Sequence, residues 1–103
     1  MNKKRLLPVD RKEQILNAAI KVAGRPGGWS KLTRDAVAKE AGCAEGLPSK
    51  YFGTMISFRR AIMRAAIQGW NLSVIAQGLA AGDKVAMKAE EELKRKALDT
   101  LVG

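Results

Sequence analysis

The sequence predicts one all-α domain of about a hundred residues, and three features predict it. Apolar residues recur at helical spacing along one face of residues 10–23. Between residues 33 and 62, two short helical patterns are joined by a glycine-containing turn and followed by a third pattern. Near the carboxyl end, oppositely charged residues lie four apart, as on the exposed face of a helix.

The first nine residues are predicted to be a basic arm, because Lys3, Lys4 and Arg5 precede the first helix. The stretch is too short, and too soon followed by charge, to be a secretory signal. Two interpretations stay open: the arm enters a DNA minor groove, as homeodomain arms do, or it is a solvated tail. The apolar stripe of the following helix is predicted to be core, with Ile15, Leu16, Ala19, Val22 and Ala23.

The second and third helices are predicted from their end signals. The hydroxyl of Thr33 suits a helix N-cap, and Gly42 suits the left-handed residue that ends a helix. Pro48 is tolerated only in a first turn, so the third helix is expected to begin near Gly46 or Leu47. Gly53 is then expected to end the third helix, and Thr54 to be the N-cap of the fourth. The glycine-rich residues 24–28 lack the Gly-Lys-Ser/Thr ending of a phosphate-binding loop and are interpreted as a turn.

These residues resemble the TetR family of bacterial transcriptional repressors, over roughly residues 11–62. The matching segments are Ile15-Leu16-Asn17-Ala18-Ala19, residues 29–33, Ala41-Gly42-Cys43-Ala44-Glu45-Gly46, Tyr51-Phe52 and Phe58. The resemblance implies a helix-turn-helix whose recognition helix spans residues 44–52, followed by a helix whose start touches phosphate. The sequence departs from the family where Ser49 replaces a phosphate-contacting tyrosine, Met55 replaces a lysine, and Pro48 replaces an apolar residue.

The predicted DNA interface follows from this resemblance. Lys50, Ser49 and Glu45 are expected at or near base edges, with Gly46 at the start of the recognition helix. The expected phosphate contacts are Lys31, Thr33, Arg34, Tyr51 and Thr54. Three further basic residues are interpreted as ordinary solvated positions: Arg59, Arg60 and Arg64.

The charge is unevenly spread along the chain. Residues 1–64 hold 14 Lys or Arg and 5 Asp or Glu, whereas residues 65–103 hold 5 of each, so the first part carries the whole net charge of +9. A polyanionic partner suits this distribution, because neutralising phosphates releases condensed counterions. The alternative is a solubilising surface. The chain is accordingly divided into an arm (1–9), a DNA-binding helix-turn-helix domain (10–64) and a helical dimerisation segment (65–103).

The dimerisation segment is predicted to contain the rest of a long fourth helix and a carboxyl-terminal helix over residues 83–102. Residues 65–82 carry no charge, but their glycines, glutamines and asparagine make a membrane span a poor interpretation. Apolar side chains here are instead expected to bury against a twin subunit. The predicted dimer interface consists of Ile67, Trp70, Val74, Leu79, Leu93 and Leu101.

Composition argues against several functional classes. One cysteine makes an internal disulfide impossible, and the absence of histidine nearly excludes metal sites and histidine acid-base chemistry. Cys43 is interpreted as filling the small apolar position of the turn rather than sensing redox state. No nucleophile has a recognisable base, so neither an enzyme nor a cofactor is expected, and a cytoplasmic location of the bacterial, plasmid or phage type is expected.

The sequence therefore predicts a homodimeric repressor that binds a palindromic operator in double-stranded DNA. About 35 residues follow Gly69, too few to enclose a ligand pocket within one subunit, so no small-molecule inducer is expected. One alternative is a protein-interaction module, an antirepressor or adaptor that kept the fold but lost its DNA contacts; Ser49 and Met55 favour it. A further alternative is a nucleoid binder without sequence preference.

Overall fold

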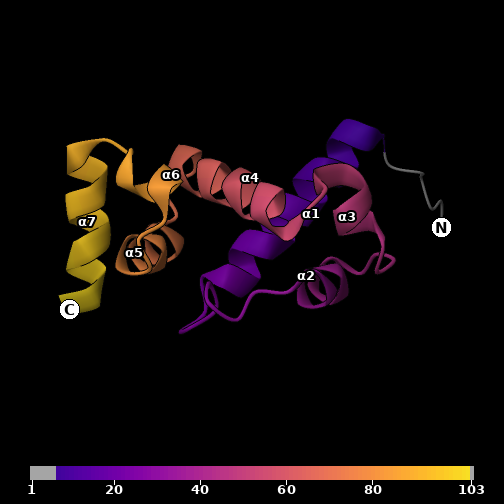
Figure 1. Ribbon diagram of the computed structural model, residues 1–103, viewed down its shortest axis with the longest axis horizontal. Helices are drawn as coiled ribbons and strands as arrows, with labels where there is room; N and C mark the ends of the chain where they lie inside the picture. Colours follow the sequence, from indigo (N-terminus) through magenta and orange to yellow (C-terminus); the bar gives the residue numbers. More distant parts are fainter. Residues whose placement is uncertain (1–6, 103) are drawn as a thin grey trace, which may run out of the picture.

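The computed structural model describes residues 7–102 and is all-helical over that range, which confirms the predicted all-α class. The seven helices are α1 (Pro8–Ala23), α2 (Arg34–Ala41), α3 (Leu47–Phe52), α4 (Met55–Gln68), α5 (Leu72–Ala80), α6 (Lys84–Met87) and α7 (Glu91–Val102). The molecule is elongated, with principal extents of 44 × 24 × 21 Å. Helices α2 and α3 lie toward one end and α5 and α7 lie at the other, with α4 running between them (Figure 1).

The core runs the length of the molecule. Helix α1 packs against α2 and α4, and α5 packs against α4 and α7. The predicted stripe of α1 is confirmed for Ile15, Ala19, Val22 and Ala23, which are buried, whereas Leu16 is only half-buried. Phe58 and Ile62 of α4 are fully buried beside them. The core therefore fixes α1 and α4 as the frame on which the shorter helices sit.

The segment between α1 and α2 is the predicted turn, and a single glutamine of α5 ties it down. The Gln77 side chain accepts a hydrogen bond from the Trp29 amide (2.9 Å) and donates to the carbonyls of Ala23 (2.8 Å) and Arg25 (3.0 Å). Gly28 packs so closely against the backbone at the end of α1 that a Cβ would collide with carbonyl oxygens there. Helix α5 and the turn therefore hold each other in place.

The expected long fourth helix is shorter than predicted, because α4 ends at Gln68. Trp70 adopts a left-handed conformation, with φ of +54°. Its amide donates to the Ile67 carbonyl (3.2 Å), and the Asn71 amide donates to the Ala66 carbonyl (2.8 Å). This is the Schellman pattern of a helix end, and it reverses the chain so that α5 packs back on α4.

The expected helix over residues 83–102 is also divided. The Asp83 carboxylate caps α6 by accepting from the Ala86 amide (2.9 Å), but α6 has only four residues and α7 begins at Glu91. Within residues 7–102, the ion pair on α7 joins Lys94 to Glu91 (3.0 Å), rather than following the predicted spacing of four. Lys94 also donates to the Met87 carbonyl (2.9 Å), which ties the two helices together.

Two residues assigned to a dimer interface are corrected by the structure. Val74 and Leu93 are only 1% and 3% exposed in the single chain, because they fill the core shared by α5 and α7. Ile67 and Leu79 are half-buried, while Trp70 and Leu101 are 52% and 56% exposed. Two of the six residues assigned to a dimer interface are therefore covered within the chain itself.

None of the helices in residues 7–102 is both long and apolar enough to cross a membrane.

Candidate nucleic-acid interface

Helices α2 and α3, with the turn between them, have the predicted local geometry. The Thr33 hydroxyl accepts a hydrogen bond from the Ala36 amide (3.1 Å), which confirms it as the N-cap of α2. Gly42 is left-handed, with φ of +70°, and the Cys43 amide donates to the Ala38 carbonyl (3.0 Å). Figure 1 views α2 nearly along its axis while α3 lies across it, so the two helices cross.

Helix α3 begins at Leu47, as the position of Pro48 predicted, and its apolar side packs against the rest of the chain. Pro48 is buried in its first turn. The ring of Phe52 stacks on that of Phe58 from α4, with centroids 5.0 Å apart. The opposite face of α3 carries Ser49 and Lys50, which are both exposed. A short helix fixed on its apolar side thus presents its polar side outward.

The other predicted base-edge residues lie just before this helix. Glu45 and Gly46 are exposed in the turn that leads into α3. Tyr51 is half-buried, and the Lys50 ammonium lies 5.7 Å from the centre of its ring, within the range of a cation-π contact. Lys50 is therefore exposed to solvent with its ammonium over the face of the Tyr51 ring, which helps to position it.

The starts of α2 and α4 come together beside α3. An Arg34 guanidinium nitrogen donates to the Gly53 carbonyl (3.1 Å), which joins the first residue of α2 to the turn before α4. The Thr54 hydroxyl caps α4 by accepting from the Ser57 amide (3.1 Å). A shallow hollow of about 320 Å³ lies between them, lined by Leu32, Thr33, Arg34, Asp35 and Met55. Two helix N-termini thus flank one hollow, and backbone amides at such ends favour anions.

The predicted contact residues at this hollow are accessible. Thr33 and Thr54 are exposed, as is Lys31 on the approach to α2, and Arg34 is half-buried against the turn. Met55, at the position where the TetR family has a lysine, is half-buried at the same place. The bridge between Arg34 and Gly53 was not predicted; the only sequence signal for it is a basic residue directly after one N-cap and a Gly-Thr pair before the next.

The ion pairs of the amino-terminal half lie away from this surface. Glu40 pairs with Arg25 (2.7 Å) and Lys21 (3.7 Å), which ties α2 to the end of α1. The hydrogen bond from Arg25 lowers the pKa of the Glu40 carboxyl, and the positive charges of both partners act in the same direction. Within residues 7–102, no ion pair engages Arg34 or Lys50. Among the described residues, these two basic side chains are therefore not paired with a carboxylate.

Arg59 is not the ordinary solvated position that the sequence predicted. Its guanidinium donates to the Trp29 carbonyl (2.7 Å) and lies 4.8 Å from the centre of the Trp29 ring. Burial lowers its pKa, although the charge of Asp83 acts in the opposite direction. Arg59 therefore fixes the loop before α2 onto α4 and is a structural residue, whereas Arg60 and Arg64 are exposed as expected.

Three further sequence expectations concern Cys43, metal ligands and the amino-terminal arm. Cys43 is half-buried and packs against the core, as expected of a small apolar turn residue. Within residues 7–102, no group of three or more potential metal ligands comes together. The basic residues of the amino-terminal arm, Lys3, Lys4 and Arg5, lie outside the described residues.

Comparisons with protein-family models, with curated proteins and with solved structures give no match for this chain. The resemblance to the TetR family consequently rests on the residues of the turn and its flanking helices.

Proposed function

We propose that the chain is a sequence-specific DNA-binding transcriptional regulator, namely a homodimeric repressor that binds a palindromic operator without a small-molecule inducer. The observation that carries this proposal is the arrangement around α3. Phe52 of this short helix stacks on Phe58 of α4, and its exposed face carries Lys50. The capped N-termini of α2 and α4 lie beside it. Base edges and phosphates of one duplex are the ligands that suit such a surface.

In this proposal α3 enters the major groove. Lys50 donates to guanine, Ser49 donates or accepts, and Glu45 accepts from cytosine. Six residues make a helix roughly 9 Å long at 1.5 Å rise per residue, so one copy contacts few base pairs. Specificity for a long site therefore requires two copies on two half-sites, which explains the proposed dimer and palindrome.

The hollow between α2 and α4 receives the DNA backbone. Thr33 and Thr54 lie at the two helix starts, and Arg34 is oriented by its bond to the Gly53 carbonyl. Phosphate oxygens at this position would accept from backbone amides and from the remaining guanidinium hydrogens. Lys31, on the approach to α2, and Tyr51, within α3, complete the proposed set of phosphate contacts.

The direct test is selection of bound duplexes from a random DNA pool at about 0.15 M salt, the physiological value, followed by sequencing. Enrichment of an inverted repeat is expected and would supply the half-site spacing. Binding without enrichment would contradict sequence specificity and favour the nucleoid binder. No binding at all would overturn the proposal in favour of a protein-interaction module.

A charge-matched pair of variants sharpens the test. Lys50→Ala removes the proposed base contact and should cost about 1–3 kcal/mol on the selected site while relaxing the preference there. Lys88→Ala removes another exposed positive charge, from the carboxyl-terminal half, and should leave affinity nearly unchanged. Arg34→Ala should weaken binding to all sequences and reduce the salt slope by about one. Equal effects of the two lysine variants would show that only net charge matters.

A further inference from the structure

Trp70 has a left-handed backbone conformation, which is uncommon for a residue other than glycine. Three helix ends in the structure share the same hydrogen-bond pattern, and their left-handed residues are Gly42, Trp70 and Gly82. A Cβ in this conformation crowds the neighbouring carbonyl, which is why glycine is usual there. Trp70 nevertheless has φ of +54° and leaves 52% of its surface exposed. A large aromatic side chain is therefore held outward at the corner between α4 and α5.

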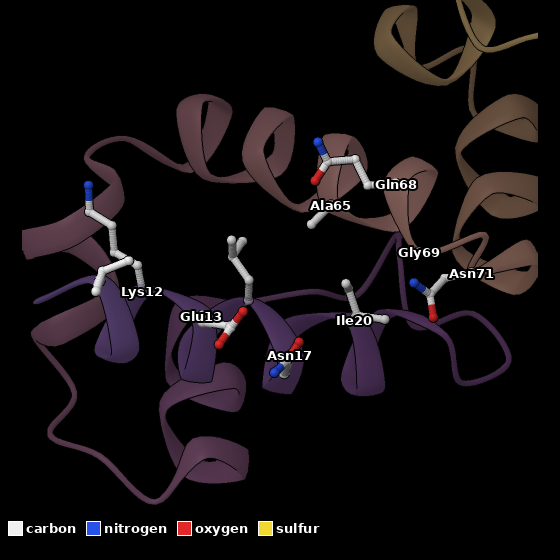
Figure 2. Close-up of a pocket in the computed structure, with 10 residues that line it drawn as sticks. Lys12, Glu13, Asn17, Ile20, Ala65, Gln68, Gly69 and Asn71 are labelled. Atoms are coloured by element: carbon white, nitrogen blue, oxygen red, sulfur yellow. The ribbon is translucent and has the colours of Figure 1, made fainter. Parts of the chain in front are cut away.

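An open groove begins beside this corner. It has a volume of about 480 Å³ and lies between α1 and the end of α4. Both chain neighbours of Trp70, Gly69 and Asn71, line it. Figure 2 shows Ile20 of α1 and Ala65 of α4 facing one another across the groove. Val9 and Leu16 extend the apolar wall on the side of α1. The groove thus has an apolar wall that suits one face of an indole ring, and polar residues line the rest of it: Lys12, Glu13, Asn17, Gln68 and Asn71.

The charges around the groove suit a second copy of this chain. Lys12 and Glu13, which line it, cancel one another, and residues 65–82 carry no charge. Most of the amino-terminal half is strongly positive, so two copies that met through other faces of that half would repel. A neutral groove within a basic protein is a poor site for nucleic acid and a suitable one for self-association.

The protruding side chain and the groove are neighbours, which is what a two-fold interface needs. In such an interface the same patch of both subunits meets, so a protrusion and the cavity that receives it must lie on one patch. Tryptophan is also among the residues that contribute most to interfaces when it fills a pocket. Trp70 and the groove meet the first requirement, because the two chain neighbours of Trp70 line the groove.

We propose that Trp70 of one copy inserts into the groove between α1 and α4 of a second copy, and that the second Trp70 does the same in return. This inference deepens the proposed function, because it rests on the homodimer proposed there. It replaces the interface centred on Val74 and Leu93 with one centred on Trp70, Ile20 and Ala65. The corner between α4 and α5, which carries Trp70, lies toward the opposite end of the molecule from α3 (Figure 1).

The first experiment measures the mass of the wild-type chain by light scattering over a concentration series without DNA, together with tryptophan emission. Trp29 is only 4% exposed, so a change in emission reports Trp70. A dimer whose formation shifts the emission to the blue and protects it from a soluble quencher is expected. A monomer at all concentrations, or a dimer in which Trp70 stays accessible to the quencher, would overturn the proposal.

A complementation experiment separates the two halves of the contact. Trp70→Gly removes the protruding ring and suits the left-handed backbone, and Asn17→Trp fills the groove from an exposed position of α1. Each variant alone should weaken dimerisation by at least about 30-fold, the loss expected for a hot spot. Mixing them should restore one of the two insertions, because the Trp70 of one can enter the open groove of the other, so the mixed dimer should be tighter than either variant alone and weaker than wild type. If Trp70→Gly dimerises like wild type, or the mixture associates no better than the separate variants, the interface is wrong.

Two controls distinguish failure of the Trp70 contact from failure of the fold and from failure of DNA binding. Circular dichroism must show that both variants remain helical, so that loss of the dimer is not loss of the fold. Binding of Trp70→Gly to a duplex with a single half-site should equal that of wild type. A wild-type dimer that fails to bind DNA would contradict the proposed DNA binding and leave the Trp70 contact standing. Half-site binding by a wild-type monomer would contradict the Trp70 contact and the proposed homodimer and leave DNA binding standing.

Discussion

The turns that follow α2 and α4 have the same hydrogen bonds and different residues. After α2, the Gly42 amide donates to Lys39 (3.2 Å) and Cys43 to Ala38 (3.0 Å); after α4, the corresponding bonds are 3.2 and 2.8 Å. The left-handed position is glycine in the first turn and Trp70 in the second. The first turn therefore follows from local preference, whereas the second is imposed against it.

What imposes the second turn is the anchoring of α5. Gln77 holds the loop between α1 and α2 by three backbone hydrogen bonds, and the Ser73 hydroxyl donates to the Gly24 carbonyl (2.6 Å). Val74, Ile75 and Ala76 are buried beneath them. Backbone strain of this kind persists only where the surroundings over-determine it. The contrast predicts that α5 contacts, rather than the turn residue, decide whether the chain reverses at Trp70.

The largest effect is expected from releasing α5. Gln77→Met keeps the size of the side chain but leaves the Trp29 amide and the Ala23 carbonyl without their partner, at a cost of about 2 kcal/mol. Urea unfolding followed by circular dichroism measures this cost. Gln68→Met is the matched control, since Gln68 is exposed and makes no side-chain hydrogen bond within residues 7–102. Equal stabilities of the two variants would mean that Gln77 does not anchor α5.

A smaller effect tests the strain itself. Gly42→Ala should cost about 1 kcal/mol, because nothing crowds the added methyl and only the backbone conformation opposes it. At position 70, Trp70→Gly should be more stable than Trp70→Ala by a similar amount, since both variants lack the indole and differ only at Cβ.

The control for this comparison is a helix interior. At Arg64, exposed within α4, alanine should be more stable than glycine by about 0.5–1 kcal/mol, the opposite order. Chemical unfolding of the five variants and the wild-type chain at low protein concentration measures all three differences. If alanine equals glycine at position 70, the turn after α4 does not hold a left-handed residue, and the contrast with Gly42 disappears.

The same contrast explains what the sequence predicted and what it did not. Residues at helix ends act on backbone groups only a few residues away, so their roles could be predicted from the sequence. The structure confirms these roles for Thr33, Gly42, Pro48 and Thr54. The end of α4 was missed because its left-handed residue is tryptophan, which gives no local signal. Long-range anchors such as Gln77 have no signature in periodicity, because their partners lie about fifty residues away.

The apolar pattern of the sequence predicted that certain side chains are buried, but not which part of the structure covers them. Val74 and Leu93 were correctly expected to be covered, yet they are covered by α5 and α7 of the same chain. The helix spacing fixes which side chains share a face, and the turn at Trp70 decides what that face meets. The DNA-contact residues of α3 and the dimer itself stay predictions for the binding and association experiments.

The smallest effect concerns the charged bond that ties α2 to the end of α1. The hydrogen bond from Arg25, aided by Lys21, lowers the pKa of Glu40 in the folded chain. A carboxyl with a lowered folded pKa stabilises the fold above its unfolded pKa, and this contribution is lost as pH falls through the folded value. Glu40→Gln should therefore unfold at a slightly lower temperature than wild type at pH 7, with the difference vanishing in acid.

Because the pair is exposed, salt should screen much of this difference. Thermal unfolding of both proteins between pH 2 and pH 7, with and without added salt, measures it. Glu45→Gln, which removes a carboxylate that makes no ion pair within residues 7–102, should show no such pH-dependent gap. A gap that persists in acid would mean that Glu40 acts through packing, and that the local attachment of α2 owes little to its charge.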